Sequence, residues 1–375
     1  MRFHARAAAT ALLIAIIGAP GVGAAAAGPG TPEAAPAPET VEPAGAPVGR
    51  WAWVVVTDPL SGASLGPGSP FGRALGGNTL VDRTGEGTWT VVWEIVPATT
   101  FPNGGTIHVT SLGSDPAACS VVSWVRTSAK VEAKVRCGNW NDPYVDSPFI
   151  AMWQMHPSPY ESYEGKSSGY AFMNLPSSSG TPSLDYQATS SGDQVTSTRT
   201  GVGSYLVTMP GLERAEHALV TSWKTDTVCR PDDWSATASE FVVEVGCRLR
   251  DNTPSDEGFT IFAGRNVSMG GVSNGRSAYA VVRKSSVTRY RVAAADGFNP
   301  AGGPIVVRYL AKGHVTVRFV GMPAGGAAVV SSIGSTSTCQ VGSLPRTGKD
   351  LQIGIRCFAP SDVPNRGRFV VSWGK

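Results

Sequence analysis

Apolar and polar residues alternate with a period of two through most of the chain, and no stretch sustains the 3.6-residue period of a helix. Turn-forming glycine, proline, serine and aspartate interrupt the alternation at short intervals. Seven short strands in about 100 residues predict an antiparallel β-sandwich of immunoglobulin-like architecture. A small β-barrel is the alternative, because it too buries one face of each strand. The predicted strands of the first such stretch lie near 51–56, 78–83, 88–94, 105–112, 119–125, 131–137 and 148–153.

The same pattern occurs three times, and cysteines mark its frame. The two cysteines of every pair have the same spacing of about 18 residues, and corresponding cysteines recur with a period of about 110 residues. The six are Cys119, Cys137, Cys229, Cys247, Cys339 and Cys357. A phenylalanine follows each second cysteine at one fixed interval, at Phe149, Phe259 and Phe369. Such a period is the signature of a repeated structural unit.

The repeat divides the chain into segments. We predict a first unit at 50–153, a second at 168–264 and a third at 277–375. The segments 154–167 and 265–276 are rich in serine, glycine and proline, and we predict them to be linkers.

The cysteine pairs predict one disulfide in each unit. The second cysteine shares the inward face of its strand, because residues 131, 133, 135 and 137 lie in one phase. The spacing predicts a bridge between neighbouring strands that are joined by a long loop, which would stabilise each unit by about 3 kcal/mol. Free buried thiols are the alternative. Zinc is disfavoured, because no histidine accompanies any pair and two thiolates do not complete a zinc site.

Several motifs of the repeat resemble those of a known group of proteins. They are the aromatic-alanine pairs Trp51-Ala52, Tyr170-Ala171 and Tyr279-Ala280, with Cys119-Ser120-Val121-Val122-Ser123-Trp124 and Val135-Arg136-Cys137. This pattern resembles a repeat family of uncharacterised secreted actinobacterial proteins with disulfide-bonded β domains. The second unit keeps Trp234 at the tryptophan position, whereas the third has Leu344 there. The resemblance implies a fold and carries no catalytic or binding residue.

The N-terminus has the features of a secretory signal peptide. Arg2 and Arg6 precede a short apolar run, which ends in the small residues 24–27. We predict that 1–27 is removed on export through the Sec pathway, and that the mature chain has no transmembrane segment. The Pro/Ala-rich segment 28–49 has almost no large apolar side chains and is predicted to be a disordered spacer.

Motifs for catalysis or metal binding are weak. Two Gly-x-Ser-x-Gly matches, at 165–169 and 271–275, fall in or beside the predicted linkers, where no helix follows the serine. The four histidines of the mature chain, His108, His156, His217 and His314, occupy unrelated places in the repeat. Asp142, Asn252 and Asp362 recur in one loop, and we interpret them as turn residues rather than calcium ligands. We therefore predict no catalytic residue, no metal and no cofactor.

Charge distinguishes the three units more than any motif does. The chain carries 31 basic and 28 acidic residues, a net charge of +3. By unit, the net charges are about −1, −6 and +10. The basic third unit is a candidate anion-binding surface, although its charge could instead dock on the acidic second unit. The candidate residues are Arg283, Lys284, Arg289, Arg291, Arg308, Lys312, Arg318, Arg356, Arg366 and Arg368.

These observations favour a secreted, non-catalytic binding or structural protein of the cell envelope or extracellular space. Its candidate partners are an anionic cell-wall polymer, a glycan or extracellular nucleic acid. Aromatic residues outside the core phase, Trp140, Tyr144, Tyr160, Tyr163 and Trp223, are the candidates for stacking on sugars. Two alternatives remain: a secreted hydrolase with a site between domains, and an extracellular protease inhibitor or effector that uses the segment between the cysteines as an exposed loop.

Overall fold

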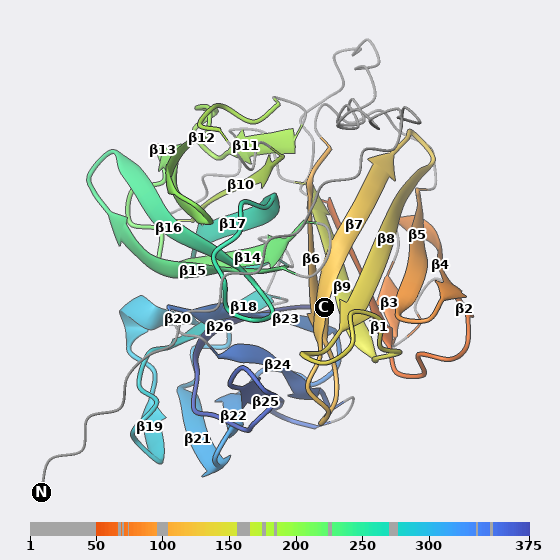
Figure 1. The fold of residues 1–375 in the computed structure, drawn as a ribbon. Helices are drawn as coiled ribbons and strands as arrows, with labels where there is room; N and C mark the ends of the chain where they lie inside the picture. Colours follow the sequence, from red (N-terminus) through yellow and green to blue (C-terminus); the bar gives the residue numbers. More distant parts are fainter. Residues whose placement is uncertain are drawn as a thin grey trace, which may run out of the picture. The chain divides into compact units, whose positions relative to one another are not determined.

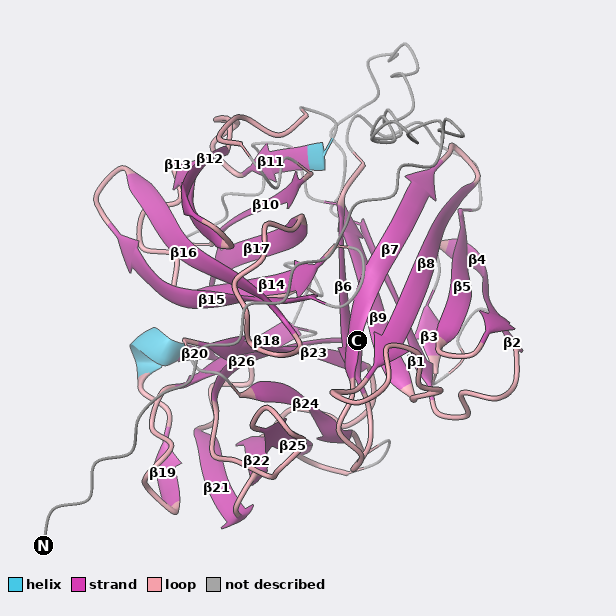
Figure 2. Cartoon of the chain, viewed as in Figure 1, coloured by secondary structure: helices cyan, strands magenta, loops and turns pink. Residues whose placement is uncertain are grey.

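The computed structural model describes residues 50–375, except 67–68, 70, 74, 96–103, 156–165, 175–177, 184–185, 224–226, 270–276, 335–336 and 346–347. Regular structure in these residues is almost all β-strand, with a short 3-10 helix, η3 (Ala294–Asp296), in the third unit. Figure 2 shows the strands as the dominant element. The predicted all-β class is confirmed. The predicted signal peptide and spacer, residues 1–49, lie outside the described residues.

The first unit contains two antiparallel sheets, in the strand orders β3-β1-β9-β6 and β2-β4-β5-β8-β7. The second sheet, which holds both cysteines, is called the cysteine sheet below. Strands β2 and β3 are short edge strands, one in each sheet, that the alternation does not predict. The strands of this unit are β1 (Arg50–Val56), β2 (Ala63–Leu65), β3 (Gly72–Arg73), β4 (Gly76–Gly85), β5 (Thr88–Ile95), β6 (Thr106–Ser111), β7 (Ala118–Arg126), β8 (Lys130–Gly138) and β9 (Phe149–Met155).

The second unit repeats this arrangement, with sheets β11-β10-β17-β14 and β12-β13-β16-β15. Its cysteine sheet has four described strands, one fewer than in the first unit. The strands are β10 (Ser167–Met173), β11 (Gln187–Thr189), β12 (Thr196–Gly201), β13 (Ser204–Pro210), β14 (His217–Ser222), β15 (Thr227–Ala236), β16 (Glu240–Leu249) and β17 (Phe259–Arg265).

The third unit has sheets β20-β18-β26-β23 and β19-β21-β22-β25-β24, of four and five strands. Figure 1 colours the three units in turn from red to yellow, in green and in blue. The sandwich prediction is therefore confirmed for all three. The strands are β18 (Ser277–Val282), β19 (Arg289–Arg291), β20 (Gly297–Phe298), β21 (Ile305–Ala311), β22 (His314–Phe319), β23 (Ala327–Ile333), β24 (Thr338–Ser343), β25 (Leu351–Phe358) and β26 (Arg368–Gly374).

Alternation places the core between the two sheets of a unit. In β5, the buried residues Trp89, Val91, Trp93 and Ile95 alternate with half-buried polar or small residues. In contrast, β9 is buried along its whole length, because one face meets its own unit and the other meets neighbouring units. Continuous apolar strands of this kind are expected where both faces are covered.

Each disulfide joins two neighbouring strands at directly opposite positions, as Cys119 of β7 does with Cys137 of β8. The same holds for Cys229–Cys247 and Cys339–Cys357. The predicted pairing of neighbouring strands is confirmed, but the predicted long loop is wrong. In the first unit, β7 and β8 form a hairpin with a tight turn at residues 127–129, and the cysteines lie at its open end. The segment between the cysteines therefore consists of the two arms of a hairpin. Three disulfides indicate an oxidising environment.

The same turn supports the disulfide in every unit. Gly87, Gly203 and Gly313 have φ angles of 61°, 66° and 69°. Their carbonyl groups accept hydrogen bonds from the backbone N–H groups of Cys137, Cys247 and Cys357 at 2.9, 2.7 and 3.0 Å. A Cβ atom on any of these glycines would lie within 2.8 Å of the carbonyl oxygen of that cysteine. The repeat needs glycine here both for the left-handed backbone and for this close approach.

Backbone contacts connect the three units to one another in a cycle. Val121 of the first unit pairs with Trp223 of the second. Gly334 N–H of the third unit donates to the Pro231 carbonyl of the second at 3.0 Å, and Gly113 N–H of the first donates to the Val341 carbonyl of the third at 2.8 Å. Because 121, 231 and 341 are separated by the period of the repeat, the three contacts use equivalent positions.

Side chains reinforce this cycle, and Gln340 does so most extensively. Its Nε2 donates to the Gly113 and Asp115 carbonyl groups at 3.0 and 2.7 Å. Its Oε1 accepts from the Ala117 N–H at 3.0 Å. One apolar cluster also includes buried residues of all three units, such as Trp53, Phe262 and Val371. The units are therefore packed on one another by a shared core, a feature that the sequence does not predict.

Candidate anion-binding surface

The cysteine sheet of the third unit has a basic outer face. Arg289 of β19 lies directly opposite Arg308 of β21. On the same strands, Arg291 lies opposite Val306, and Val306 in turn lies opposite Arg318 of β22. Arg356 of β25 pairs with His314 of β22 on the same face. Arg289, Arg291, Arg308 and Arg318 are exposed, because a strand that is buried on one face turns every second residue outward. Lys312 lies in the exposed turn between β21 and β22.

Arg289 and Arg308 occupy directly opposite positions on adjacent strands, an arrangement in which like charges are destabilising. Among the described residues, neither has an ion-pair partner, and the same is true of Arg291, Lys312 and Arg356. Arg318 is the exception, since it forms an ion pair with Asp350. The face therefore carries several uncompensated positive charges.

The fold itself does not require this charge. The positions equivalent to Arg308 are Asp82 in β4 and Thr198 in β12, which occupy the same register against β5 and β13. The corresponding face of the second unit carries Glu244 where the third unit has Gly354. The opposed arginine pair is thus specific to the third unit.

Four of the ten candidate residues lie elsewhere. Arg283 forms an ion pair with Asp296 at 3.1 Å, lies 4.5 Å from the ring of Trp234 and reaches Asp233 at 3.9 Å, so it docks on the second unit. Lys284 lies 5.7 Å from the ring of Tyr290. The remaining two donate to backbone carbonyl groups: Arg366 to Ser285 and Ser286, and Arg368 to Gly334. The structure thus divides the predicted set into an outward face and a smaller group that holds loops in place.

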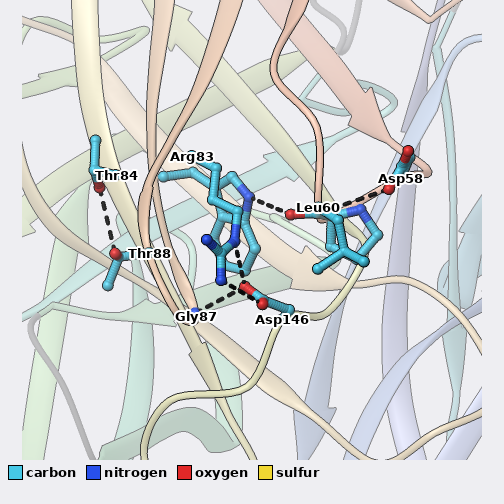
Figure 3. A network of polar contacts seen from close by, with 9 residues as sticks. Asp58, Leu60, Arg83, Thr84, Gly87, Thr88 and Asp146 are labelled. Carbon is cyan, nitrogen blue, oxygen red and sulfur yellow. Dashed lines mark hydrogen bonds and ion pairs between the residues drawn. The ribbon is translucent and has the colours of Figure 1, made fainter.

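The acidic loop after the second cysteine forms a clamp in two units. Arg83 of β4 donates to both carboxylate oxygens of Asp146, at 3.0 and 2.6 Å, and Gly87 N–H donates to the same carboxylate at 2.9 Å (Figure 3). The hydrogen bonds from the Arg83 guanidinium lower the pKa of Asp146. Arg199 and Asp256 form the same pair in the second unit. The sequence Arg-Thr-Gly occurs in both units, at 83–85 and 199–201, and the clamp accounts for its arginine.

The third unit replaces the clamp with a different contact. Tyr309 stands at the arginine position and Arg366 at the aspartate position, and the guanidinium lies 5.4 Å from the tyrosine ring. A neutral ion pair is thus exchanged for a cation–π contact with a net positive charge, which adds to the basic character of the third unit without loss of the loop attachment.

Removing the clamp should destabilise the second unit. We expect Asp256→Asn to lower the free energy of unfolding by about 2 kcal/mol, because it weakens charge-assisted hydrogen bonds to Arg199 and Tyr205. Urea unfolding at pH 7 measures the loss. The substitution Asp251→Asn is the control, since this carboxylate is exposed and only orders its own turn. Equal losses in the two variants would contradict the role of the clamp.

The other candidates include no metal centre in the part of the chain that the structure describes. Among the described residues, no group of three or more metal-ligating side chains occurs. Ser167 of the first Gly-x-Ser-x-Gly match begins strand β10, so its placement in a linker is wrong, and no helix follows it. The second match and His156 lie outside the described residues. None of the three described histidines hydrogen-bonds to a carboxylate in the part of the chain that the structure describes.

The loop positions interpreted as turn residues lie in turns. The Asp142 carboxylate accepts a hydrogen bond from the Tyr144 N–H at 2.8 Å. Asn252 and Asp362 have positive φ angles of 69° and 61°, which asparagine and aspartate tolerate better than most residues. Asp362 also lines a pocket that is described below, and its burial raises its pKa.

The described candidates for sugar stacking have different surroundings. Tyr144 is 42% exposed, and the Arg136 guanidinium lies 4.7 Å from its ring. Trp223 packs on Phe172 at a ring-centroid distance of 4.3 Å. Trp140 is half-buried and lines the same pocket as Asp362. Tyr160 and Tyr163 lie outside the described residues.

Equivalent segments of the three units line a small pocket where they meet. It has a volume of about 50 Å³, and its lining includes Ala118, Val228 and Thr338, which occupy the same position in the three repeats. A second pocket of similar volume, lined by hydroxyl groups such as those of Thr221 and Ser331, shares these residues. Arg230 and Arg250 line both pockets. Aligning the three repeats on their cysteines could have revealed these two arginines, because neither the first nor the third unit has a basic residue at these positions.

Comparison with known proteins adds no assignment. No protein family, no curated protein and no solved structure matches the chain. Among the described residues, no helix has the length and apolar character needed to cross a bilayer.

Proposed function

We propose that this protein is a secreted, non-catalytic binding protein of the cell envelope or extracellular space, and that the basic face of its third unit binds an anionic polymer. The observation that carries the proposal is the pair Arg289 and Arg308, two opposed and unpaired arginines on an exposed sheet face. Such a pair costs stability in the free protein, and a polyanion would relieve the repulsion.

Several features support the other parts of this proposal. The three disulfides fit an oxidising compartment, and the N-terminal sequence fits export by a signal peptide. The flat array of separate positive charges fits a repeating polyanion better than a small molecule, because each arginine can contact a different monomer. The resemblance to secreted repeat proteins is consistent with this role.

The rival functions have less support. A hydrolase with a Ser-His-acid triad would need an accessible histidine beside an acid, whereas His108 and His217 are buried and the half-buried His314 has no carboxylate partner among the described residues. An inhibitor would present the segment between the cysteines as an exposed loop, whereas this segment is a paired β-hairpin. Polymer binding is therefore the hypothesis to test first.

Binding of polyphosphate by the full-length, oxidised protein tests the proposal. We expect affinity to fall as salt rises, because bound counterions are released from the polymer. The double substitution Arg289→Gln and Arg308→Gln should weaken binding and reduce the slope of log K against log salt by about 1.4 if both arginines contact phosphates. Fluorescence anisotropy with labelled polyphosphate at several salt concentrations measures both effects.

A matched control removes two positive charges from the first unit. Lys130 and Lys134 lie on the outer face of β8, and Lys134 is exposed. Replacing both with glutamine should change the slope little. Equal effects of the two double variants would show that net charge, rather than the basic face, governs binding, and an absence of binding at low salt would overturn the proposal.

A further inference from the structure

Three arginines converge on the pocket where the three units meet. Arg230, Arg248 and Arg250 all belong to the second unit and line the pocket, together with the carboxylate of Asp362. The equivalent residues are Ser120, Gly138 and Trp140 in the first unit, and Gln340, Phe358 and Pro360 in the third. The fold therefore does not need arginine at these positions, and the pocket has more positive than negative charge.

Arg248 and Arg250 are held by backbone groups. Arg248 donates to the Asn252 carbonyl at 3.2 Å, and Arg250 donates to the Asn139 carbonyl of the first unit at 2.5 Å. A Cβ atom on Gly138 would lie 2.6 Å from the Arg250 guanidinium, so glycine at this position leaves room for it. These two arginines are thus fixed in place beside the pocket.

Arg230 is the anomalous member of the group. The residue is 5% exposed, and its Nε, which faces Asp232 Oδ1, has no hydrogen-bond partner among the described residues. Its only charge partner among the described residues is Asp232, at 3.6 Å, which is too long for a hydrogen bond. Burial lowers the pKa of Arg230. A buried guanidinium with so little compensation is costly, and natural proteins usually pair such a charge.

A second buried polar group lies in the adjoining pocket. The hydroxyl of Thr227, 5% exposed, lines this second pocket and has no hydrogen-bond partner among the described residues. Arg230 and Arg250 line this second pocket as well as the first, so its hydroxyl groups adjoin the arginine cluster. This donor set matches an anion with several acceptor oxygens.

We propose that this pocket binds one small oxyanion of the phosphate or sulfate class, with Arg230 as its principal ligand and Arg248 and Arg250 as supporting charges. The volume of about 50 Å³ favours a free inorganic ion, because pockets for organic ligands are several times larger. The planar guanidinium forms two parallel hydrogen bonds with such ions. The ion would join the three units, since all three line its site.

Thermal unfolding of the full-length, oxidised protein tests this site. In a chloride buffer free of phosphate and sulfate, and at constant ionic strength, added phosphate or sulfate should raise the Tm to a plateau, as expected for one binding site. Isothermal titration with inorganic phosphate should give one ion per chain. Chloride at the same ionic strength should give no such rise.

Substitutions distinguish this pocket from the basic face. Arg230→Gln introduces the residue that the third unit already has at this position, Gln340, so the variant should fold; it should weaken phosphate binding at least tenfold. Arg230→Lys, which keeps the charge but loses the planar fork, should bind with intermediate affinity. The Arg289→Gln and Arg308→Gln variant should bind phosphate like the unsubstituted protein, even though it binds polyphosphate less well.

Three results would overturn the proposal. The first is a Tm that rises with phosphate without saturation, and the second is unchanged phosphate affinity in Arg230→Gln. The third is loss of phosphate binding in the basic-face variant, which would place the ion on the outer sheet. Because polyphosphate binding is measured separately, failure of the proposed function leaves this test intact.

Discussion

Acidification from pH 7 to pH 4.5 should lower the free energy of unfolding by about 5 kcal/mol through two buried histidines, and His108→Leu should remove about half of this loss. His108 and His217 are both fully buried, and burial lowers the pKa of each to about 3. In the unfolded chain their pKa is about 6.5. The folded protein therefore keeps both imidazoles neutral at pH values where the unfolded chain protonates them.

The direction of the effect follows from proton linkage. Stability rises with pH wherever the unfolded state binds more protons than the folded state. The contribution of the two histidines is complete above pH 6.5 and is lost as the pH falls toward 3. Asp146 and Asp256, whose pKa values are lowered by their arginine partners, add a further loss that begins near pH 5 and grows below pH 4. Between pH 6.5 and 4.5 the loss therefore comes mainly from the histidines, and Glu216 and Asp362, whose pKa values are raised by burial, oppose part of it.

Both histidines lie near contacts between units, so acid should loosen the packing of the three units. His108 Nδ1 lies 3.0 Å from the Thr221 hydroxyl of the second unit. The ring of His217 stacks on Tyr279 of the third unit with a centroid distance of 3.9 Å. A charge on either ring would be buried in this packed interior.

The equivalent positions in the other two units indicate which substitution of His108 the fold should tolerate. Leu219 and Val329 occupy the register of His108 in β14 and β23, so leucine suits this position. Urea unfolding of His108→Leu at intervals between pH 7 and 4.5 should give a shallower pH dependence than the unsubstituted protein. His314→Gln is the control, because this ring is partly exposed beside Arg356 and its loss should leave most of the dependence in place. Parallel curves for His108→Leu and the parent protein would contradict the prediction.

Periodicity allows the local structure to be predicted from the sequence. Alternation identifies the strands because each has one buried face, and the period of the repeat aligns the three cysteine pairs. The short edge strands β2 and β3 escape this method, because two or three residues are too few to show a period. The hairpin between the cysteines is not predicted either, because the spacing of two cysteines does not distinguish a pair of hydrogen-bonded strands from an irregular loop.

Contacts between units are not predictable in this way. Gln340 lies at the position of Ser120 and Arg230, yet its polar atoms reach a loop of the first unit that is distant in sequence. The basic face could be predicted in part, since Arg318 and Arg356 lie in the outward phase of their strands. The docking of Arg283 on Trp234 could not, because it depends on how the second and third units pack. The pocket arginines are visible only once the three repeats are compared position by position.

Removal of one disulfide should lower the free energy of unfolding by about 3 kcal/mol in any of the three units. The reason is loop-closure entropy: each bridge closes a segment of the same length, with a sequence separation of 18, so the unfolded chain gains the same freedom in each case. The paired substitutions are Cys119→Ala with Cys137→Ala, Cys229→Ala with Cys247→Ala, and Cys339→Ala with Cys357→Ala. Urea unfolding at pH 7 gives the three losses.

The shared core predicts how these variants unfold. Because one apolar cluster includes residues of all three units, loss of the bridge in one unit should leave a single cooperative transition with the midpoint shifted to lower urea. Two separate transitions in a variant would contradict the coupling of the units. A loss below about 1 kcal/mol would instead contradict the entropic role of the bridge.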